Sequence, residues 1–220
     1  MVGTLEFRAI QEPVRTVKNI GGYYQAKARR IDYEKRELIC EDIFKINEEF
    51  KLEFDYLVVA CGSKTNTFGT PGIQEREGKE VFFLKHLYHA RQVRNRILEC
   101  FEQAAIHQTN PAERDRLLSF VVVGGGPTSC ELVGELHDFI HQDVIRFYPD
   151  LVPHISIHLV EASPKLLGSF DASIATFVKR KFQSKQIKVK TGVAVKSYDH
   201  ITGKAYLSDD TSLDVGMLVW

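Results

Sequence analysis

Apolar and polar residues alternate over two short stretches near the start of the chain, which predicts a pair of antiparallel strands. These strands cover residues 22–32 and 36–44, with a polar turn at residues 33–35. An apolar run over residues 54–62 predicts a buried strand that ends at a glycine. The polar segment at residues 63–72 then predicts a loop.

The remainder of the chain switches between helical and strand periodicity, which is typical of an α/β fold. Asn110 and Pro111 have the residue types of a helix cap and a first helical residue. Helices are predicted over residues 84–105, from 111, 128–146 and 171–183, and strands over residues 120–123, 154–160, 187–198, 204–207 and 215–220.

Three consecutive glycines stand between a predicted strand and a predicted helix, where a dinucleotide-binding turn is expected. Gly124 permits the tight turn, and Gly126 lets the backbone approach a pyrophosphate, which the helix N-terminus attracts. The turn also contains Gly125, Pro127, Thr128 and Ser129. Ser129 occupies the third fingerprint position, where glycine is usual, and serine is small enough for close packing of helix and strand. The alternative is a glycine-rich turn that binds nothing.

Glu161 ends the next predicted strand, where an acidic residue is expected in this type of site. It lies 161 − 124 = 37 residues after Gly124, whereas the usual spacing is about 20. A long helix and the segment at residues 147–153 account for the difference. A carboxylate here accepts hydrogen bonds from ribose hydroxyls and repels a 2′-phosphate, which favours NAD(H) over NADP(H). The sequence therefore predicts a Rossmann-type NAD-binding domain with a parallel sheet.

Charge and composition exclude several other classes of protein. The 29 lysines and arginines balance the 29 aspartates and glutamates, so no overall field attracts nucleic acid or an anionic membrane. No apolar run approaches the length of about 20 residues that a membrane-spanning helix needs, and no targeting segment is predicted. The four cysteines form no CxxC pair and are interpreted as reduced thiols, with Cys61 as a buried small side chain.

Other clusters of polar residues are interpreted as structural. His137 and His141 are four residues apart on a predicted helix, but no third ligand accompanies them, so no metal site is predicted. His154 and His158 are placed on one face of a strand. Arg91, Arg94 and Arg96 are interpreted as a solvated helix face and not as a nucleic-acid surface.

Several segments together resemble the type II NADH dehydrogenases, especially the fungal and plant mitochondrial alternative enzymes. The most specific block runs from residue 118 through the three glycines to Glu131 and residues 134–136. Residues 55–62 resemble the Ala-Thr-Gly strand of the family, with Cys61 in place of threonine. Further similar segments are residues 2–10, 13–15, 66–72 and 160–162.

This resemblance implies a two-dinucleotide flavoprotein in which NADH passes hydride to FAD, and FAD passes electrons to ubiquinone in the respiratory chain. It implies a peripheral location on the mitochondrial inner membrane, and a homodimer is one assembly that it allows. Ala60, Cys61 and Gly62 would then contact FAD, and Glu131 would lie close to the nicotinamide and flavin. A helix N-terminal acid that complements the helix dipole is an equal alternative for Glu131.

The same comparison predicts the domain organisation. Residues 1–70 would form a partial FAD-binding domain, rich in β-structure, that lacks its N-terminal glycine-rich unit, and residues 71–220 would form an NAD(H)-binding Rossmann domain truncated at its C-terminal end. The chain thus looks like an internal fragment, and membrane association is expected only through a missing C-terminal part. Whether the isolated chain binds FAD or is active stays open. The alternatives are a non-catalytic NAD-binding remnant and a flavin oxidoreductase that resembles apoptosis-inducing factor.

Overall fold

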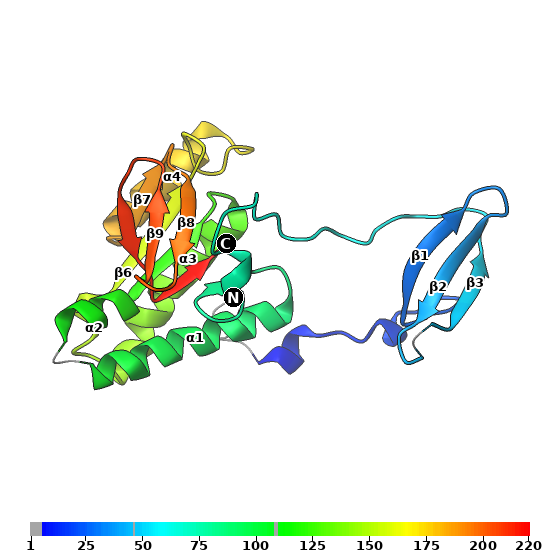
Figure 1. Cartoon of the computed structure of the whole chain (residues 1–220), viewed down its shortest axis with the longest axis horizontal. Coiled ribbons are helices and arrows are strands. Elements are labelled where there is room, and N and C mark those ends of the chain that lie inside the picture. The colour runs from blue at the N-terminus through cyan, green and yellow to red at the C-terminus, as the bar shows by residue number, and fades with distance from the viewer. Residues whose placement is uncertain (1–5, 46, 108–109) are drawn as a thin grey trace. The chain divides into compact units, whose positions relative to one another are not determined.

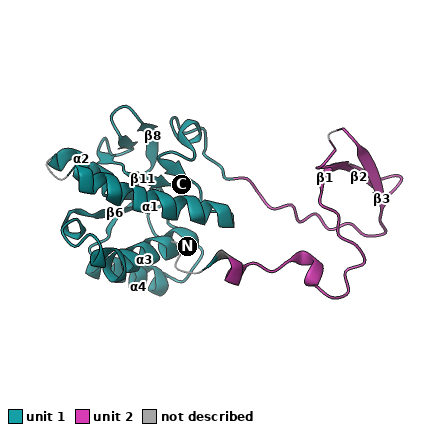
Figure 2. Ribbon diagram, turned by 90° about the horizontal axis from the view of Figure 1, so that it is seen from below, with its two compact units in different colours: residues 1–7, 65–220 teal, residues 8–64 magenta. Residues whose placement is uncertain are grey.

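The chain folds into two compact units, one built on Thr65–Trp220 and one on Arg8–Lys64 (Figure 2). The computed structural model describes residues 6–45, 47–107 and 110–220. Residues 2–5 of the family-like N-terminal segment lie outside the described residues. Each unit contains its own β-structure.

The central sheet of the larger unit is parallel throughout, as predicted (Figure 1). Its strand order is β4–β11–β5–β6–β7, so the last strand of the chain lies between two earlier ones. The strands are β4 (Val81–Phe82), β5 (Ser119–Val123), β6 (Ser156–Glu161), β7 (Lys188–Thr191) and β11 (Met217–Val219). The mostly apolar, buried strands at the centre of the sheet are typical of a parallel sheet covered on both faces.

Helices form the layer on one face of this sheet, within a few residues of the predicted bounds. They are α1 (Leu87–Ile106), α2 (Pro111–Leu117), α3 (Pro127–Gln142) and α4 (Ala172–Ser184). The Asn110 side chain accepts a hydrogen bond from the Glu113 N–H, so it caps α2 as predicted. Within the described residues, no helix combines the length and the hydropathy that crossing a lipid bilayer requires.

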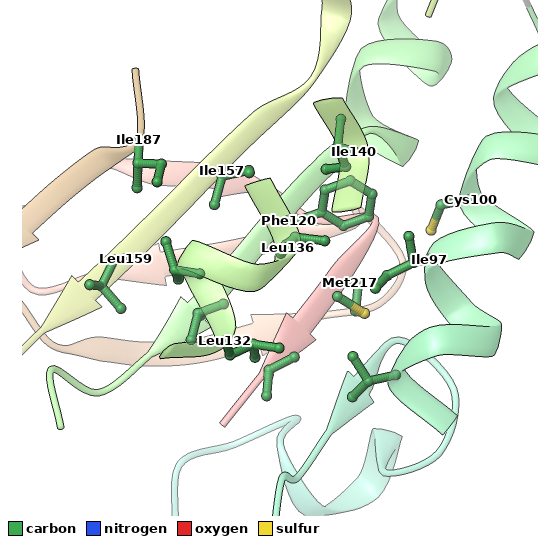
Figure 3. Packing of buried hydrophobic residues seen from close by; sticks show 14 of the residues in the cluster. Ile97, Cys100, Phe120, Leu132, Leu136, Ile140, Ile157, Leu159, Ile187 and Met217 are labelled. Carbon is green, nitrogen blue, oxygen red and sulfur yellow. The ribbon is translucent and has the colours of Figure 1, made fainter. Parts of the chain in front are cut away.

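Apolar side chains from these helices and from alternate strand residues form the main core. Figure 3 shows Ile97 of α1, Leu136 of α3 and Phe120 of β5 within this core. All three are fully buried, and burying a side chain of this size stabilises the fold by about 1.5–3 kcal/mol. The core therefore fixes the helices against the sheet that carries the glycine turn.

An antiparallel sheet of three short strands packs against the opposite face. It consists of β8 (Val195–Asp199), β9 (Lys204–Leu207) and β10 (Ser212–Asp214) in the order β10–β9–β8. Val121 and Val160, which alternate with the residues facing the helices, contribute to a second core with residues of this sheet. The predicted strand at residues 187–198 is two strands, because the chain turns at Gly192 with φ of 74°. β4 and β10 were not predicted.

The smaller unit is an antiparallel sheet in the order β1–β2–β3. β1 (Ala26–Asp32) and β2 (Glu37–Asp42) form the predicted hairpin, and β3 (Glu49–Glu53) was not predicted.

Short 3₁₀ helices in both units complete the described elements: η1 (Phe7–Ile10), η2 (Val14–Thr16), η3 (Gln74–Arg76), η4 (Val144–Arg146) and η5 (Val152–His154).

The buried strand predicted at residues 54–62 is wrong in this structure. Tyr56 is 94% exposed and Val58 is 84% exposed, and residues 54–62 form no strand. A strand requires a neighbour that pairs with its backbone N–H and C=O groups. Among the described residues no strand pairs with residues 55–62, so Tyr56, Val58 and Val59 lie in solvent, whereas Phe54 and Leu57 are half-buried.

Candidate functional site

The glycine turn lies at the carboxyl end of β5 and leads directly into α3. Gly124 has φ of 103°, a backbone conformation that residues other than glycine rarely adopt. Its N–H donates to the Val160 carbonyl over 2.8 Å, so the turn is tied to the end of β6. Gly126 is the N-cap of α3, and no side chain caps the helix. The first-turn N–H groups of Thr128 and Ser129 can therefore bind an anion.

Ser129 fits the position where the fingerprint normally has glycine. A Cβ built on Gly124 would lie 3.4 Å from the Ser129 Oγ, which is an ordinary van der Waals contact. The Ser129 hydroxyl thus lies close to Gly124 without crowding it, and the departure from the fingerprint leaves the turn intact.

Glu161, at the end of β6, lies next to the turn as the sequence analysis predicted. Its carboxylate accepts hydrogen bonds from the backbone N–H groups of Gly125 and Ser163. A Cβ on Gly125 would approach the Glu161 Cγ to 2.8 Å. The structure thus brings the predicted phosphate-binding turn and the predicted ribose-binding carboxylate together.

A cavity of about 600 Å³ opens beside this pair, within the size range of small-molecule sites. Its walls come from the ends of β5 and β6, from the segment after β7, and from residues of the loop before η3. The lining residues are Thr65, Phe68, Thr70, Val123, Gly124, Val160, Glu161, Ala162, Ser163, Val193, Ala194, Val195 and Trp220. Glu161 is the one charged group among these described residues, so the cavity offers no cation to a 2′-phosphate.

Glu131 lines a different cavity, of about 290 Å³, with Pro127, Leu167 and Phe170. Glu131 is exposed on α3, and the adjacent Cys130 is buried. Burial raises the pKa of the Cys130 thiol to about 11, and the neighbouring acids Glu131 and Glu161 act in the same direction. Cys130 is therefore a protonated packing group beside the turn.

The three proposed flavin contacts lie in the smaller unit. Ala60 and Cys61 line an apolar cavity of about 360 Å³ together with residues of β1, and Gly62 has φ of 70°. Cys61 is exposed, which corrects its interpretation as a buried side chain, because the strand that would have buried it does not form. In the described part of residues 8–64, no glycine turn leads into an α-helix, so these residues do not make a complete flavin site.

Arg96 was predicted on a solvated face of α1, and this is wrong. It is 8% exposed, and its Nε and Nη2 donate to the Gly216 carbonyl over 3.0 and 2.8 Å. This carbonyl lies just before β11 and is buried beneath α1, so it requires a donor. Arg91, on the preceding turns of α1, is exposed as expected, and Arg94 is half-buried.

The histidines divide between stacking and burial. The rings of His137 and His141 stack with their centroids 4.1 Å apart, and His137 Nδ1 lies 2.9 Å from Asp138 Oδ1. His154 and His158 do not share a strand, because His154 ends η5 whereas His158 is buried in β6. Within the described ranges, no three metal-ligating side chains come together.

The sequence analysis did not single out several residues of the larger cavity. One of them is Trp220, which directly follows β11. It thus has the same place relative to its strand as Gly124 has after β5 and Glu161 has at the end of β6. Because the carboxyl ends of parallel strands meet at one edge, an aromatic residue at the end of a further strand was a usable signal. The contribution of Phe68 could not be predicted, because it depends on where the loop packs.

The comparisons with known proteins agree with this geometry. A family model described as pyridine nucleotide-disulphide oxidoreductase matches residues 4–220. A probable NADH dehydrogenase of Dictyostelium discoideum is 40% identical over all of this chain and 48% of its own length. The external NADH-ubiquinone oxidoreductase 2, mitochondrial, of Saccharomyces cerevisiae is 36% identical over all of this chain and 41% of its own. The chain thus spans less than half the length of these relatives.

A solved structure points the same way. The structure of NDH2 from Plasmodium falciparum in complex with NADH superposes with a TM-score of 0.80 and 32% identity, over 90% of this chain and 40% of that one. The α/β fold with a parallel sheet and the resemblance to type II NADH dehydrogenases are therefore confirmed. The chain belongs to the pyridine nucleotide-disulphide oxidoreductase family.

Proposed function

We propose that this chain is the NADH-binding part of a flavin-dependent NADH dehydrogenase that reduces a quinone. One observation carries the proposal: the glycine turn and the Glu161 carboxylate meet at the carboxyl edge of a parallel sheet, beside a cavity of about 600 Å³. Dinucleotides bind at this edge in folds of this type. The names of the relatives, NADH dehydrogenase and NADH-ubiquinone oxidoreductase, agree with it.

The residues of the turn and the cavity bind and orient NADH. The backbone at Gly124, Gly125 and Gly126, continued by Pro127, Thr128 and Ser129, surrounds the pyrophosphate, whose charge the N-terminus of α3 stabilises. Glu161 accepts hydrogen bonds from the hydroxyls of the adenosine ribose. These hydroxyls replace the Gly125 N–H, which donates to the same carboxylate in the structure. The same carboxylate repels a 2′-phosphate, so NADH is preferred to NADPH. Glu131 is the proposed residue near the nicotinamide.

The whole protein would complete the reaction. When bound, FAD supplies a two-electron acceptor that takes hydride from NADH and passes electrons to ubiquinone. Ala60, Cys61 and Gly62 are the proposed contributors to its site, within a partial FAD-binding domain at residues 1–70, and residues 71–220 are the proposed NAD(H)-binding domain. A peripheral place on the mitochondrial inner membrane and a homodimer belong to the same proposal. The names of relatives support its mitochondrial part.

The incomplete flavin site favours a second candidate, a chain that binds NADH without catalysis. Flavin absorbance of the purified chain and its NADH:quinone activity separate the two. Stoichiometric FAD with quinone-dependent oxidation of NADH excludes the non-catalytic candidate. Absence of both, together with NADH binding, supports it.

Calorimetric titration with NADH and NADPH tests the binding site that both candidates share. The unmodified chain should bind NADH more tightly than NADPH. Glu161→Ala should weaken NADH binding and reduce the difference between the affinities for NADH and NADPH. Glu135→Ala, on an exposed position of α3, is the matched control and should change neither affinity. Equal affinities of the Glu161→Ala variant and the unmodified chain for both nucleotides would contradict the proposal.

A further inference from the structure

The segment at residues 65–72, which we call the strap, forms one wall of the 600 Å³ cavity. Thr65, Phe68 and Thr70 of the strap line the cavity together with Trp220. The strap and the cavity belong to the same compact unit. The site therefore has a wall that does not come from the strand ends of the Rossmann sheet.

Both ends of the strap are fixed to the rest of the unit. At one end, the Trp220 Nε1–H donates to the Asn66 carbonyl over 2.9 Å. At the other end, the Tyr198 N–H donates to the Pro71 carbonyl over 2.9 Å. Gly72 lies so close to β8 that a Cβ would approach the Tyr198 carbonyl oxygen to 1.8 Å. The strap is thus a positioned element and not a free loop.

Phe68 lies between these two anchors in an unusual conformation. Its φ is 52°, in the left-handed region that a bulky residue rarely adopts. The Asn66 Oδ1 accepts from the Phe68 N–H over 2.8 Å, and the Thr70 N–H donates to the Thr67 carbonyl over 2.9 Å. The residue is nevertheless 81% exposed. Local hydrogen bonds therefore hold an apolar ring at the cavity with most of its surface in solvent.

The strand order indicates which half of a dinucleotide this wall would meet. In the order β11–β5–β6, the central strand β5 leads to Gly124. Trp220 follows β11 on one side of β5, and Glu161 ends β6 on the other side. If the pyrophosphate lies at the glycine turn and the adenosine ribose at Glu161, the other half of the molecule extends toward Trp220. That half carries the nicotinamide.

We propose that Phe68 is a nucleotide-contacting residue that packs on the nicotinamide half of NADH, and that Trp220 is a positioning residue that holds the strap in place. The inference rests on the proposed NADH site. A planar ring that covers Phe68 would remove its exposed apolar surface from water and add an aromatic contact. The Trp220 indole acts through the Asn66 carbonyl, so its contribution comes from the fixed position of the strap.

Titration calorimetry of the 220-residue chain with NADH and with ADP-ribose, which lacks the nicotinamide, tests this assignment. Phe68→Ala should weaken NADH binding about 5- to 20-fold and leave ADP-ribose binding unchanged, whereas Phe68→Tyr should retain the affinity for NADH. Trp220→Phe keeps an aromatic ring but loses the N–H donor, and should weaken only NADH binding, by about 2- to 10-fold. Phe147→Ala, at a 77% exposed position, is the matched control and should change neither affinity.

The outcomes separate this inference from the proposed function. If Glu161→Ala weakens both ligands while Phe68→Ala and Trp220→Phe weaken neither, the strap assignment is overturned and the NADH site stands. If the Phe68 and Trp220 variants weaken NADH and ADP-ribose equally, the assignment to the nicotinamide half is wrong. If the unmodified chain binds neither ligand, the NADH site itself is wrong, and this inference falls with it.

Discussion

The Glu161 carboxylate accepts a hydrogen bond from the Gly125 N–H, and this contact joins the end of β6 to the turn that follows β5. The contact depends on the absence of a side chain at Gly125. A Cβ there would lie 2.8 Å from the Glu161 Cγ and 2.9 Å from the Leu166 Cδ2. The middle glycine of the turn is therefore required by packing between protein groups.

Gly125→Ala should destabilise the fold itself. The added methyl group forces Glu161 and Leu166 to move, and overpacking of this kind costs about 1–3 kcal/mol. Urea unfolding followed by circular dichroism should show this decrease in the free energy of unfolding, accompanied by weaker NADH binding. An unchanged unfolding midpoint would contradict the packing at the turn.

Gly126→Ala should separate binding from stability. A Cβ at Gly126 meets no atom within 4 Å, so the only expected loss of stability is the change from glycine to the poorer N-cap residue alanine, at most about 1 kcal/mol. NADH affinity should fall, because the methyl group occupies the space through which a pyrophosphate approaches the backbone. The measurements are urea unfolding and NADH titration of the same preparation.

Gly134→Ala is the control for that pair. Gly134 lies inside α3, and a Cβ there also meets no atom within 4 Å. Alanine should stabilise the helix by up to about 1 kcal/mol without changing NADH affinity. A loss of affinity in this control would show that any added methyl group on α3 disturbs the site.

Arg96→Met should reveal the contribution of the arginine hydrogen bonds beneath α1. Methionine retains much of the aliphatic volume but cannot donate to the Gly216 carbonyl, which then keeps the weak Cys100 Sγ donor at 3.5 Å. Losing the hydrogen bonds from the charged guanidinium should cost about 1.5–3 kcal/mol, which urea unfolding can measure. Arg180→Met, at an exposed position of α4, should stay within about 0.5 kcal/mol of the unmodified chain. Equal effects of the two substitutions would contradict the structural role of Arg96.

His158 should make the fold less stable at mildly acidic pH. Burial, and then the nearby Lys188 and Lys190, lower its pKa from 6.5 to about 4, while Asp214 acts in the opposite direction. Between these two pKa values the unfolded chain binds a proton that the folded chain does not, so stability falls as pH falls from about 6.5 toward 4. The loss between about pH 7.5 and about pH 5 should be roughly 2 kcal/mol.

Urea unfolding of His158→Gln at the same two pH values isolates this contribution, because His89 and His137 also have lowered pKa values and remain in the variant. Between the two pH values, the free energy of unfolding of the variant should fall by about 2 kcal/mol less than that of the unmodified chain. His200→Gln, at an exposed position of the turn after β8, should retain the full dependence. The same slope in the His158 variant and the unmodified chain would show that His158 is accessible to protons in the folded state.

Thiol labelling should detect a single reactive cysteine in the folded chain. Cys61 is exposed, whereas Cys40, Cys100 and Cys130 are buried, and burial raises the pKa of each buried thiol. A maleimide or a disulfide reagent should modify one thiol per chain quickly, and Cys61→Ser should abolish this fast phase. All four thiols should react in urea. A fast phase that persists in the serine variant would contradict the exposure of Cys61.

The parts of the fold with a strong local pattern could be predicted from the sequence. The apolar run before Gly124, the helical periodicity of α1 and the cap at Asn110 each depend on neighbouring residues only, and each is confirmed. β4 and β10 have two and three residues, which is too short for a period of two to be visible.

The errors concern features that depend on distant partners. The run at residues 54–62 has the composition of a strand, but pairing decides whether a strand forms. Arg96 belongs to a basic helix face by sequence, and only the approach of Gly216, 120 residues later, makes it a buried donor. For the site, Gly124 and Glu161 were found because strand ends mark the carboxyl edge. The strap was missed because hydrogen bonds from Trp220 and Tyr198 place it.

The position of β11 between β4 and β5 has a consequence for protein synthesis. A ribosome has made β4 and β5 long before residues 217–219 emerge, so these two strands cannot reach their final pairing during most of translation. Until then each presents an unpaired edge to other chains. The nascent polypeptide is therefore expected to depend on chaperones through the interval between β5 and β11, and ribosome stalling within that interval should increase its aggregation.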